Sequence, residues 1–267
     1  MKRLSLILLL LAVSAAFAQS PFDGTWKVAP AKAEFPSKPT ELKVTNGRFT
    51  CSSCVPKIDV KADGTPQAVA GSPYYDKVSV KVLSDNSVET ESSKGDKAMF
   101  KNTYQASDDG KTLTVRYEDH SAANGQEQRG VNVLNRVGSA PSSGNKVTGQ
   151  WKMAKVEDVT DNSMTFTFTG AGDELTYKAA TGEGYTAKLD GKDYPYKGDP
   201  GTTSVSLKAL DDHTFEETDK RDGKPIFVAK ISVSSDGKTM TIAGQDKLRG
   251  TTMKFVADKQ QGTAAGN

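Results

Sequence analysis

Apolar and polar residues alternate with a period of two along most of this chain. The pattern is clear over residues 164–168, 205–209 and 227–233, where every second residue is apolar. Because successive side chains of a β-strand point to opposite faces, the alternation predicts strands with one buried and one solvated face. Almost no segment has the three-to-four-residue spacing of an amphipathic helix. The pattern therefore predicts an all-β protein made of antiparallel sheets.

Tight-turn signals separate the alternating segments. Asp-Gly pairs, which tolerate the positive φ angles of hairpin turns, begin at residues 23, 63, 109, 190, 222 and 236. The second half of the chain alone holds about ten segments that match strand signals. Short connections place consecutive strands side by side, and a twisted sheet of many strands tends to close on itself.

A long internal repeat divides the chain. Residues 63–115 return as residues 190–242 with a constant offset of 127. The repeat predicts a barrel domain over 22–137 and a second over 147–259, joined by a Gly- and Ser-rich linker at 138–146. The small, polar tail at 260–267 is predicted to be disordered. We therefore expect two tandem antiparallel up-and-down β-barrels of about 8–10 strands each.

Each repeat begins with a Gly-x-Trp-Lys motif. The first copy lies in Phe22-Asp23-Gly24-Thr25-Trp26-Lys27 and the second is Gly149-Gln150-Trp151-Lys152. These starts resemble those of lipocalins and fatty-acid-binding proteins, which are calycin-type barrels, and the repeat body is similar to exported bacterial proteins with tandem domains. The resemblance implies that Trp26 and Trp151 plug the closed ends of two lipocalin-like barrels. It also makes Arg136 and Lys259, at the ends of the repeats, the basic residues expected to pack across these indoles.

The resemblance does not extend to the known ligand clamp. Fatty-acid-binding proteins hold the ligand carboxylate with an Arg-x-Tyr pair in the last strand, and neither 131–136 nor 252–257 contains this pair. The helix pair that follows their first strand is also missing from the sequence pattern. A barrel is therefore expected, but a fatty-acid ligand is not.

The first residues have the pattern of a secretory signal. Lys2-Arg3 precede an apolar run over 4–13, and Ala16-Phe17-Ala18 forms a small-x-small cleavage site. We expect a signal peptide at 1–18 and export to the periplasm or the medium. The run is too short to span a membrane, and no later segment is apolar enough. Cleavage would remove two of 35 basic residues and leave a formally neutral chain with 33 acidic residues. Neutrality argues against nucleic acid as a partner.

Two cysteines, Cys51 and Cys54, are the only ones in the chain. In an exported protein we expect them to form a disulfide. A redox-active pair needs a helix N-terminus, a haem attachment site needs a following His, and a zinc site needs further ligands. The residues around the pair offer none of these.

Residues suited to catalysis are few. His120 and His213 are the only histidines, which excludes a histidine metal cluster, and no Ser lies in a Gly-x-Ser-x-Gly elbow. Glu217 and Asp219 share a strand face and could serve a glycosidase or bind calcium. We expect instead that this acidic run is a solvated face balanced by Lys220 and its neighbour Arg221. No catalytic, cofactor-binding or metal-binding residue is predicted, and no enzyme activity is expected.

Four loop tyrosines remain, at corresponding parts of the two repeats: Tyr74, Tyr75, Tyr194 and Tyr196. Exposed loop tyrosines bind ligands, or else they cap a barrel mouth or pack between domains. The sequence thus predicts an exported protein that binds a small apolar or amphipathic molecule. The alternative is a structural or interaction protein with filled barrels, and the oligomeric state is open.

Overall fold

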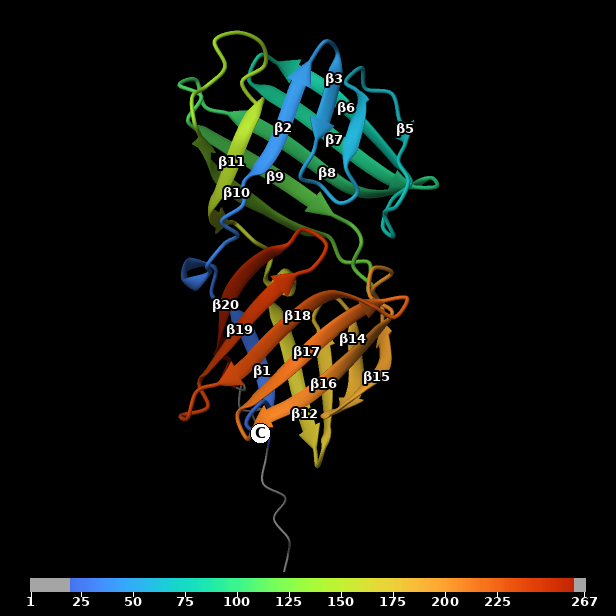
Figure 1. The fold of residues 1–267 in the computed structure, drawn as a ribbon, viewed down its shortest axis with the longest axis vertical. Coiled ribbons are helices and arrows are strands. Elements are labelled where there is room, and N and C mark those ends of the chain that lie inside the picture. The colour runs from blue at the N-terminus through green and yellow to red at the C-terminus, as the bar shows by residue number, and fades with distance from the viewer. Residues whose placement is uncertain (1–19, 262–267) are drawn as a thin grey trace, which may run out of the picture.

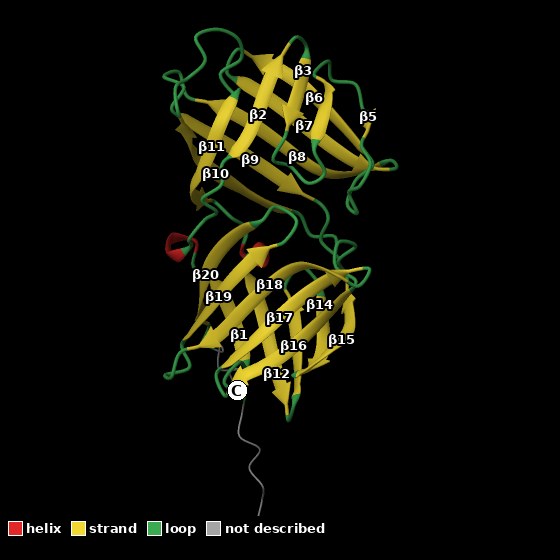
Figure 2. Ribbon diagram, in the orientation of Figure 1, coloured by secondary structure: helices red, strands yellow, loops and turns green. Residues whose placement is uncertain are grey.

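The computed structural model describes residues 20–261, and these residues are almost entirely β-structure (Figure 2). They form twenty strands and two short 3-10 helices, η1 (Pro30–Lys32) and η2 (Asp161–Ser163). The all-β class and the pair of antiparallel barrels predicted from the sequence are confirmed. The predicted signal peptide and most of the predicted tail lie outside the described residues.

Ten strands form a fully closed barrel, which we call the closed barrel. Its strands run up and down in sequence order, and β1 pairs with both β12 and β20 to complete the ring. The strands are β1 (Gly24–Val28), β12 (Thr165–Ala171), β13 (Glu174–Ala179), β14 (Gly184–Lys188), β15 (Asp190–Lys197), β16 (Ser204–Asp211), β17 (Thr214–Arg221), β18 (Lys224–Val233), β19 (Thr239–Asp246) and β20 (Thr251–Lys259).

The other ten strands form a barrel with one gap, which we call the gapped barrel. Its sheet begins at β4 and ends at β5, and these two strands do not pair. The strands are β2 (Thr40–Thr45), β3 (Arg48–Cys51), β4 (Ile58–Lys61), β5 (Gln67–Ala68), β6 (Lys77–Ser84), β7 (Ser87–Lys94), β8 (Lys97–Ala106), β9 (Thr112–Asp119), β10 (Gln128–Val137) and β11 (Gly149–Glu157).

The side chain of Gln67 links β4 to β5 across the gap, and just beyond β4 the Gly64 amide donates to the Val80 carbonyl of β6 at 2.7 Å. The Lys61 amide donates to Gln67 Oε1 at 2.8 Å, and Gln67 Nε2 donates to the Lys61 carbonyl at 2.9 Å. A carboxamide has the donor and the acceptor of a peptide group, so Gln67 replaces the missing rung of the ladder.

The two tryptophan strands are exchanged between the repeats. β1, which opens the first repeat, pairs with β12 and β20 of the second, while β11, which opens the second repeat, pairs with β10 and β2 of the first. Figure 1 shows β1 in blue among the yellow, orange and red strands of the closed barrel. The expectation that each barrel begins with its own tryptophan strand is therefore wrong. Both repeats carry the same Gly-x-Trp-Lys strand, so either copy can fill either sheet edge.

The exchange changes the meaning of the predicted linker. Residues 138–148 join β10 to β11, which are neighbouring antiparallel strands of the gapped barrel. The chain crosses between barrels at 29–39 and 158–164 instead. The gapped barrel is thus one continuous segment, 40–157, placed between β1 and β12 of the closed barrel. The ranges 22–137 and 147–259 describe the sequence repeat, but the sheets cross their boundaries.

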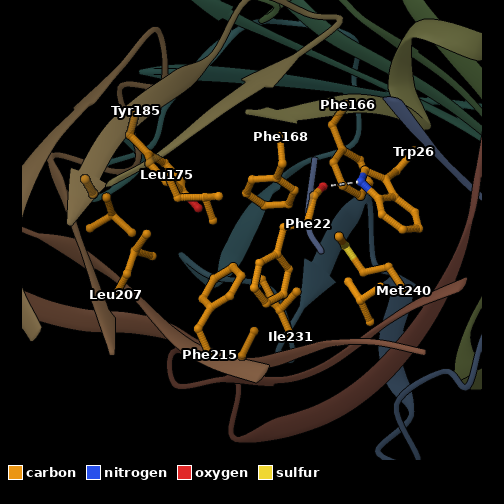
Figure 3. Close-up of a cluster of buried hydrophobic side chains, with 14 of the residues drawn as sticks. Phe22, Trp26, Phe166, Phe168, Leu175, Tyr185, Leu207, Phe215, Ile231 and Met240 are labelled. Carbon is orange, nitrogen blue, oxygen red and sulfur yellow. Dashed lines mark hydrogen bonds between the residues drawn. The ribbon is translucent and has the colours of Figure 1, made fainter. Parts of the chain in front are cut away.

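Each barrel is filled at the end that holds its tryptophan. The Trp26 indole donates to the Phe22 carbonyl at 2.8 Å, and the Trp151 indole donates to the Val147 carbonyl at the same distance. Lys259 Nζ lies 5.1 Å from the Trp26 ring centre, and the Arg136 guanidinium lies 4.0 Å from that of Trp151. Figure 3 shows the aromatic and aliphatic core that surrounds Trp26.

The two barrels are stacked end to end, and in each barrel the end away from the tryptophan faces the other barrel (Figure 1). At this junction the Asn124 amide donates to the Thr181 carbonyl at 3.0 Å. The Asn124 side chain donates to the Ala180 carbonyl at 2.8 Å. The tryptophan ends therefore lie at the two far ends of the molecule, and the loops at the facing mouths make the contact between barrels.

Candidate functional site

A cavity of about 400 Å³ lies at the mouth of the closed barrel, where the gapped barrel meets it. Tyr177, Tyr196 and Asp199 line it from the closed barrel, and Tyr74 and Ser121 line it from the gapped barrel. The crossover at 162–165 and the ring of Phe166 complete the wall. Both barrels are therefore needed to form this space.

Tyr74 is the main side chain that reaches across the junction. Its hydroxyl donates to Asp199 Oδ1 at 2.8 Å. Its ring lies against Gly201, where any side chain would collide with the phenol. Asp199 is held in turn by the Gly201 amide at 2.7 Å and by the Thr202 hydroxyl at 2.8 Å. The Gly at 201 thus allows a tyrosine from one barrel to lie on the mouth of the other.

Two carboxyl groups lie inside the closed barrel next to this cavity. Strand β17 alternates, so Glu217 and Asp219 point inward with Phe215, while Glu216 is exposed. The Tyr185 hydroxyl donates to Glu217 Oε2. Asp219 Oδ1 is buried and has no hydrogen-bond partner among residues 20–261.

The prediction that this acidic run is solvated and balanced by its basic neighbours is wrong. Lys220 pairs with Asp193, and the Arg221 Nε donates to the Gly201 carbonyl at 2.7 Å. Neither basic side chain forms an ion pair with the two inward carboxyls. The sequence pattern placed both acids on one face, but the barrel turns that face inward because Phe215 on the same face fills the core.

Burial shifts the titration of both acids in the same direction. Loss of solvation raises the pKa of the Glu217 carboxyl to about 7. Loss of solvation, together with the negative charges of Glu217 and Asp199, raises the pKa of the Asp219 carboxyl to about 8. The pair therefore holds protons close to neutral pH that ordinary carboxyls have already released.

Three tyrosine rings form the wall beside the acids. Tyr177 and Tyr185 are stacked with ring centres 5.2 Å apart, and Tyr185 and Tyr196 are 5.7 Å apart. Burial and the nearby charges of Glu217 and Asp219 raise the pKa of Tyr177 and of Tyr196, which places the acids within electrostatic reach of the cavity wall. All three hydroxyls therefore stay protonated near neutral pH and can donate hydrogen bonds.

Of the four tyrosines predicted in loops, the structure brings two to this cavity, but Tyr194 and Tyr196 lie in strand β15 and not in a loop. Tyr74 and Tyr196 line it, whereas Tyr75 packs against the core of the gapped barrel and Tyr194 donates to Asp190 at 3.1 Å. Nothing in the sequence pattern distinguished Tyr177 or Tyr185 from other strand residues. Both lie in strands with alternating apolar and polar residues, and this pattern predicts that they are ordinary core residues.

The site is present in only one barrel. The strand register pairs Cys51 with Ile58 where the closed barrel pairs Tyr177 with Tyr185. It likewise pairs Val80 with Thr90 and Val78 with Ser92, where the closed barrel has the pairs Leu207–Glu217 and Val205–Asp219. The gapped barrel thus has neutral residues at each of these positions.

The disulfide marks the corresponding region of the gapped barrel. Cys51 and Cys54 are bonded and close the turn between β3 and β4, and Cys51 is fully buried. The histidines do not contribute to the cavity: His213 is exposed in a turn, and His120 lies in a groove beside Lys77 and Glu118.

Two general features can be stated for residues 20–261. No group of three or more His, Cys, Asp or Glu side chains there is arranged to hold a metal ion. That part of the chain also has no helix with the length and apolar character of a membrane span. Comparison with known proteins found no matching family and no matching curated protein.

Proposed function

We propose that this protein binds a small amphipathic molecule in the cavity between the two barrels. The observation that carries the proposal is the cavity itself, about 400 Å³ in volume and lined from both sides. Pockets for small molecules typically measure roughly 300–1,000 Å³. The closed barrel supplies the binding groups, and the gapped barrel covers them through Tyr74.

The lining favours a molecule with one apolar part and one polar part. Phe166, Met164 and the tyrosine rings offer apolar surface, while the hydroxyls of Tyr177 and Tyr196 offer donors. The tryptophan end of the closed barrel is packed with large side chains, so a ligand would occupy the mouth and not the full length of the barrel. This differs from the deep interior pocket expected by resemblance to lipocalins.

Export remains part of the proposal. The basic start, the short apolar run and the Ala16-Phe17-Ala18 cleavage site support a signal peptide. The disulfide between Cys51 and Cys54 fits an oxidising compartment.

Binding of a neutral amphipathic fluorophore such as N-phenyl-1-naphthylamine tests the proposed function. We expect saturable binding to the wild-type protein and at least about a tenfold loss with Ser121→Trp, because an indole at 121 would fill the cavity. Ser143→Trp is the matched control, since Ser143 is exposed on the 138–148 loop at the far end of the gapped barrel. Equal binding by the two variants would place the ligand elsewhere, and no saturable binding by the wild type would refute the proposal.

A further inference from the structure

We infer that the ligand carries a positively charged nitrogen, an amine or a quaternary ammonium group, held between the three tyrosine rings and the carboxyls of Glu217 and Asp219. This inference rests on the proposed function and names the chemical class of the ligand. Four observations lead to it.

The first is a pair of carboxyls whose negative charge, once they ionise, no basic side chain of the described residues balances. Two carboxyls lie inside the closed barrel, yet the described residues form no salt bridge to either of them, and Asp219 Oδ1 has no donor at all. A buried carboxylate oxygen without a partner is strongly unfavourable and normally has a ligand, a water or a cation nearby. A protonated amine would supply both the donor and the opposite charge, and a quaternary ammonium group would supply the charge alone.

The second is the aromatic wall. The electron-rich faces of tyrosine rings attract cations, and several rings around one point are a known arrangement for alkylated ammonium groups. The three rings follow one another along the wall. The ring centre of Tyr185 lies 5.2 Å from that of Tyr177 and 5.7 Å from that of Tyr196. Tyr177 and Tyr196 both line the cavity.

The third is the sign of the remaining charges. Asp199 and Glu183 both line the cavity, and the charge of Asp199 raises the pKa of the nearby Asp219. Carboxyl groups in and beside the cavity repel an anionic ligand such as a fatty acid. The charges therefore select a cation over a carboxylate, which agrees with the missing Arg-x-Tyr clamp.

The fourth is that the gapped barrel lacks these groups. Thr90 and Ser92 occupy the places of Glu217 and Asp219, and the Cys51–Ile58 pair occupies the place of the stacked tyrosines. The acids are thus not required by the fold, since the same fold forms without them.

Cation binding should release protons. The titratable groups that face the acid pair are Tyr177 on β13, Tyr185 on β14, Tyr196 on β15 and Asp199 in the loop that follows. Strands β16 and β18 present Val205, Leu207, Phe227 and Ala229 at the paired positions. The acids hold protons near neutral pH because of their burial, so a bound cation would displace at least one proton. Affinity for the cation should therefore rise between about pH 6 and pH 9.

Titration calorimetry with three probes of equal chain length tests the inference. We expect the full chain to bind hexyltrimethylammonium at least about tenfold more tightly than hexanol near pH 8, and hexanoate more weakly than either. In buffers with different ionisation enthalpies, the heat of ammonium binding should differ because protons are released. The variant Glu217→Gln/Asp219→Asn should lose at least about tenfold in ammonium affinity and keep its affinity for hexanol.

The matched control is Thr90→Val/Ser92→Ala, which changes the corresponding positions of the gapped barrel and should bind all probes like the wild type. Near-ultraviolet circular dichroism checks that each variant is folded, and Asp219→Asn alone is the milder second variant. Equal affinity for ammonium and hexanol would overturn the inference but leave the proposed function intact. Calcium binding that displaces the ammonium and disappears in the double variant would also overturn it. No binding of any probe, N-phenyl-1-naphthylamine included, would refute both.

Discussion

The two barrels have the same kind of fold but differ in residue type at positions 217 and 219 and their counterparts. The closed barrel places Glu217 and Asp219 where the gapped barrel has Thr90 and Ser92. Ser92 Oγ, like Asp219 Oδ1, is buried without a hydrogen-bond partner, so this position is poorly satisfied in both copies. The closed barrel has ionisable groups there without a compensating basic residue, which lowers stability once they ionise and is typical of sites kept for binding.

The buried acids make stability depend on pH. Their folded-state pKa values, about 7 for Glu217 and about 8 for Asp219, lie above those of carboxyls in an unfolded chain. The folded protein therefore binds more protons than the unfolded chain. The stability that these two carboxyls contribute is fully present below about pH 4 and is lost as pH rises through about 7 to 8. We expect Glu217→Gln/Asp219→Asn to raise the melting temperature at pH 8.5 by about 5 °C and to change it far less at pH 5.

Scanning calorimetry at the two pH values measures this difference. Exposed acids with lowered pKa values, such as Asp109 and Asp236, titrate equally in both proteins, so their effect cancels in the comparison. A variant that is stabilised by the same amount at pH 5 and pH 8.5 would show that the two carboxyls do not hold extra protons.

At the scale of strands, the sequence predicted well where strands form and poorly which strands pair with each other. Alternation and Asp-Gly turns identified most strands, because each is a local property of a few residues. Which edge β1 joins is not local: Trp26 and Trp151 lie in nearly the same motif, so their strands fit either barrel. The inward direction of Glu217 was also missed, because alternation shows that two residues share a face but does not show which face is buried.

The gap between β4 and β5 gives a test at this scale. Gln67→Ala would remove both side-chain bonds to the Lys61 backbone, and we expect a loss of roughly 1–2 kcal/mol in stability. Amide hydrogen exchange at Lys61 should become faster by about tenfold or more, since about 1.4 kcal/mol corresponds to a factor of ten. The Lys188 amide in β14 of the closed barrel should keep its rate. Unchanged exchange at Lys61 would mean that the side chain does not close the gap.

At the scale of the molecule, the exchange makes the first strand a part of the more distant barrel. We expect Trp26→Ala, which empties a fully buried site beside its cross-strand partner Phe166, to cost roughly 3–5 kcal/mol. Its effect on hydrogen exchange should appear in β12–β20 and spare β3–β10, although Trp26 lies in the first repeat. Trp151→Ala should show the reverse pattern. If each variant instead weakened the barrel of its own repeat, the strand exchange would be refuted.

Because the gapped barrel is one continuous segment, the two barrels can fold at different times as the chain emerges. Strand β1 emerges before the other strands, but Thr25 in β1 bonds to Thr167 in β12, 142 residues later. The segment 40–157 can complete its ring while β1 is still without a partner, so the indole of Trp26 stays exposed during that time. Domains generally fold as they emerge, and unpaired strands with exposed apolar groups favour aggregation. The emerging chain is therefore most vulnerable to aggregation at its beginning, until β20 has also emerged, from the ribosome or from an export channel, and has closed the barrel around β1.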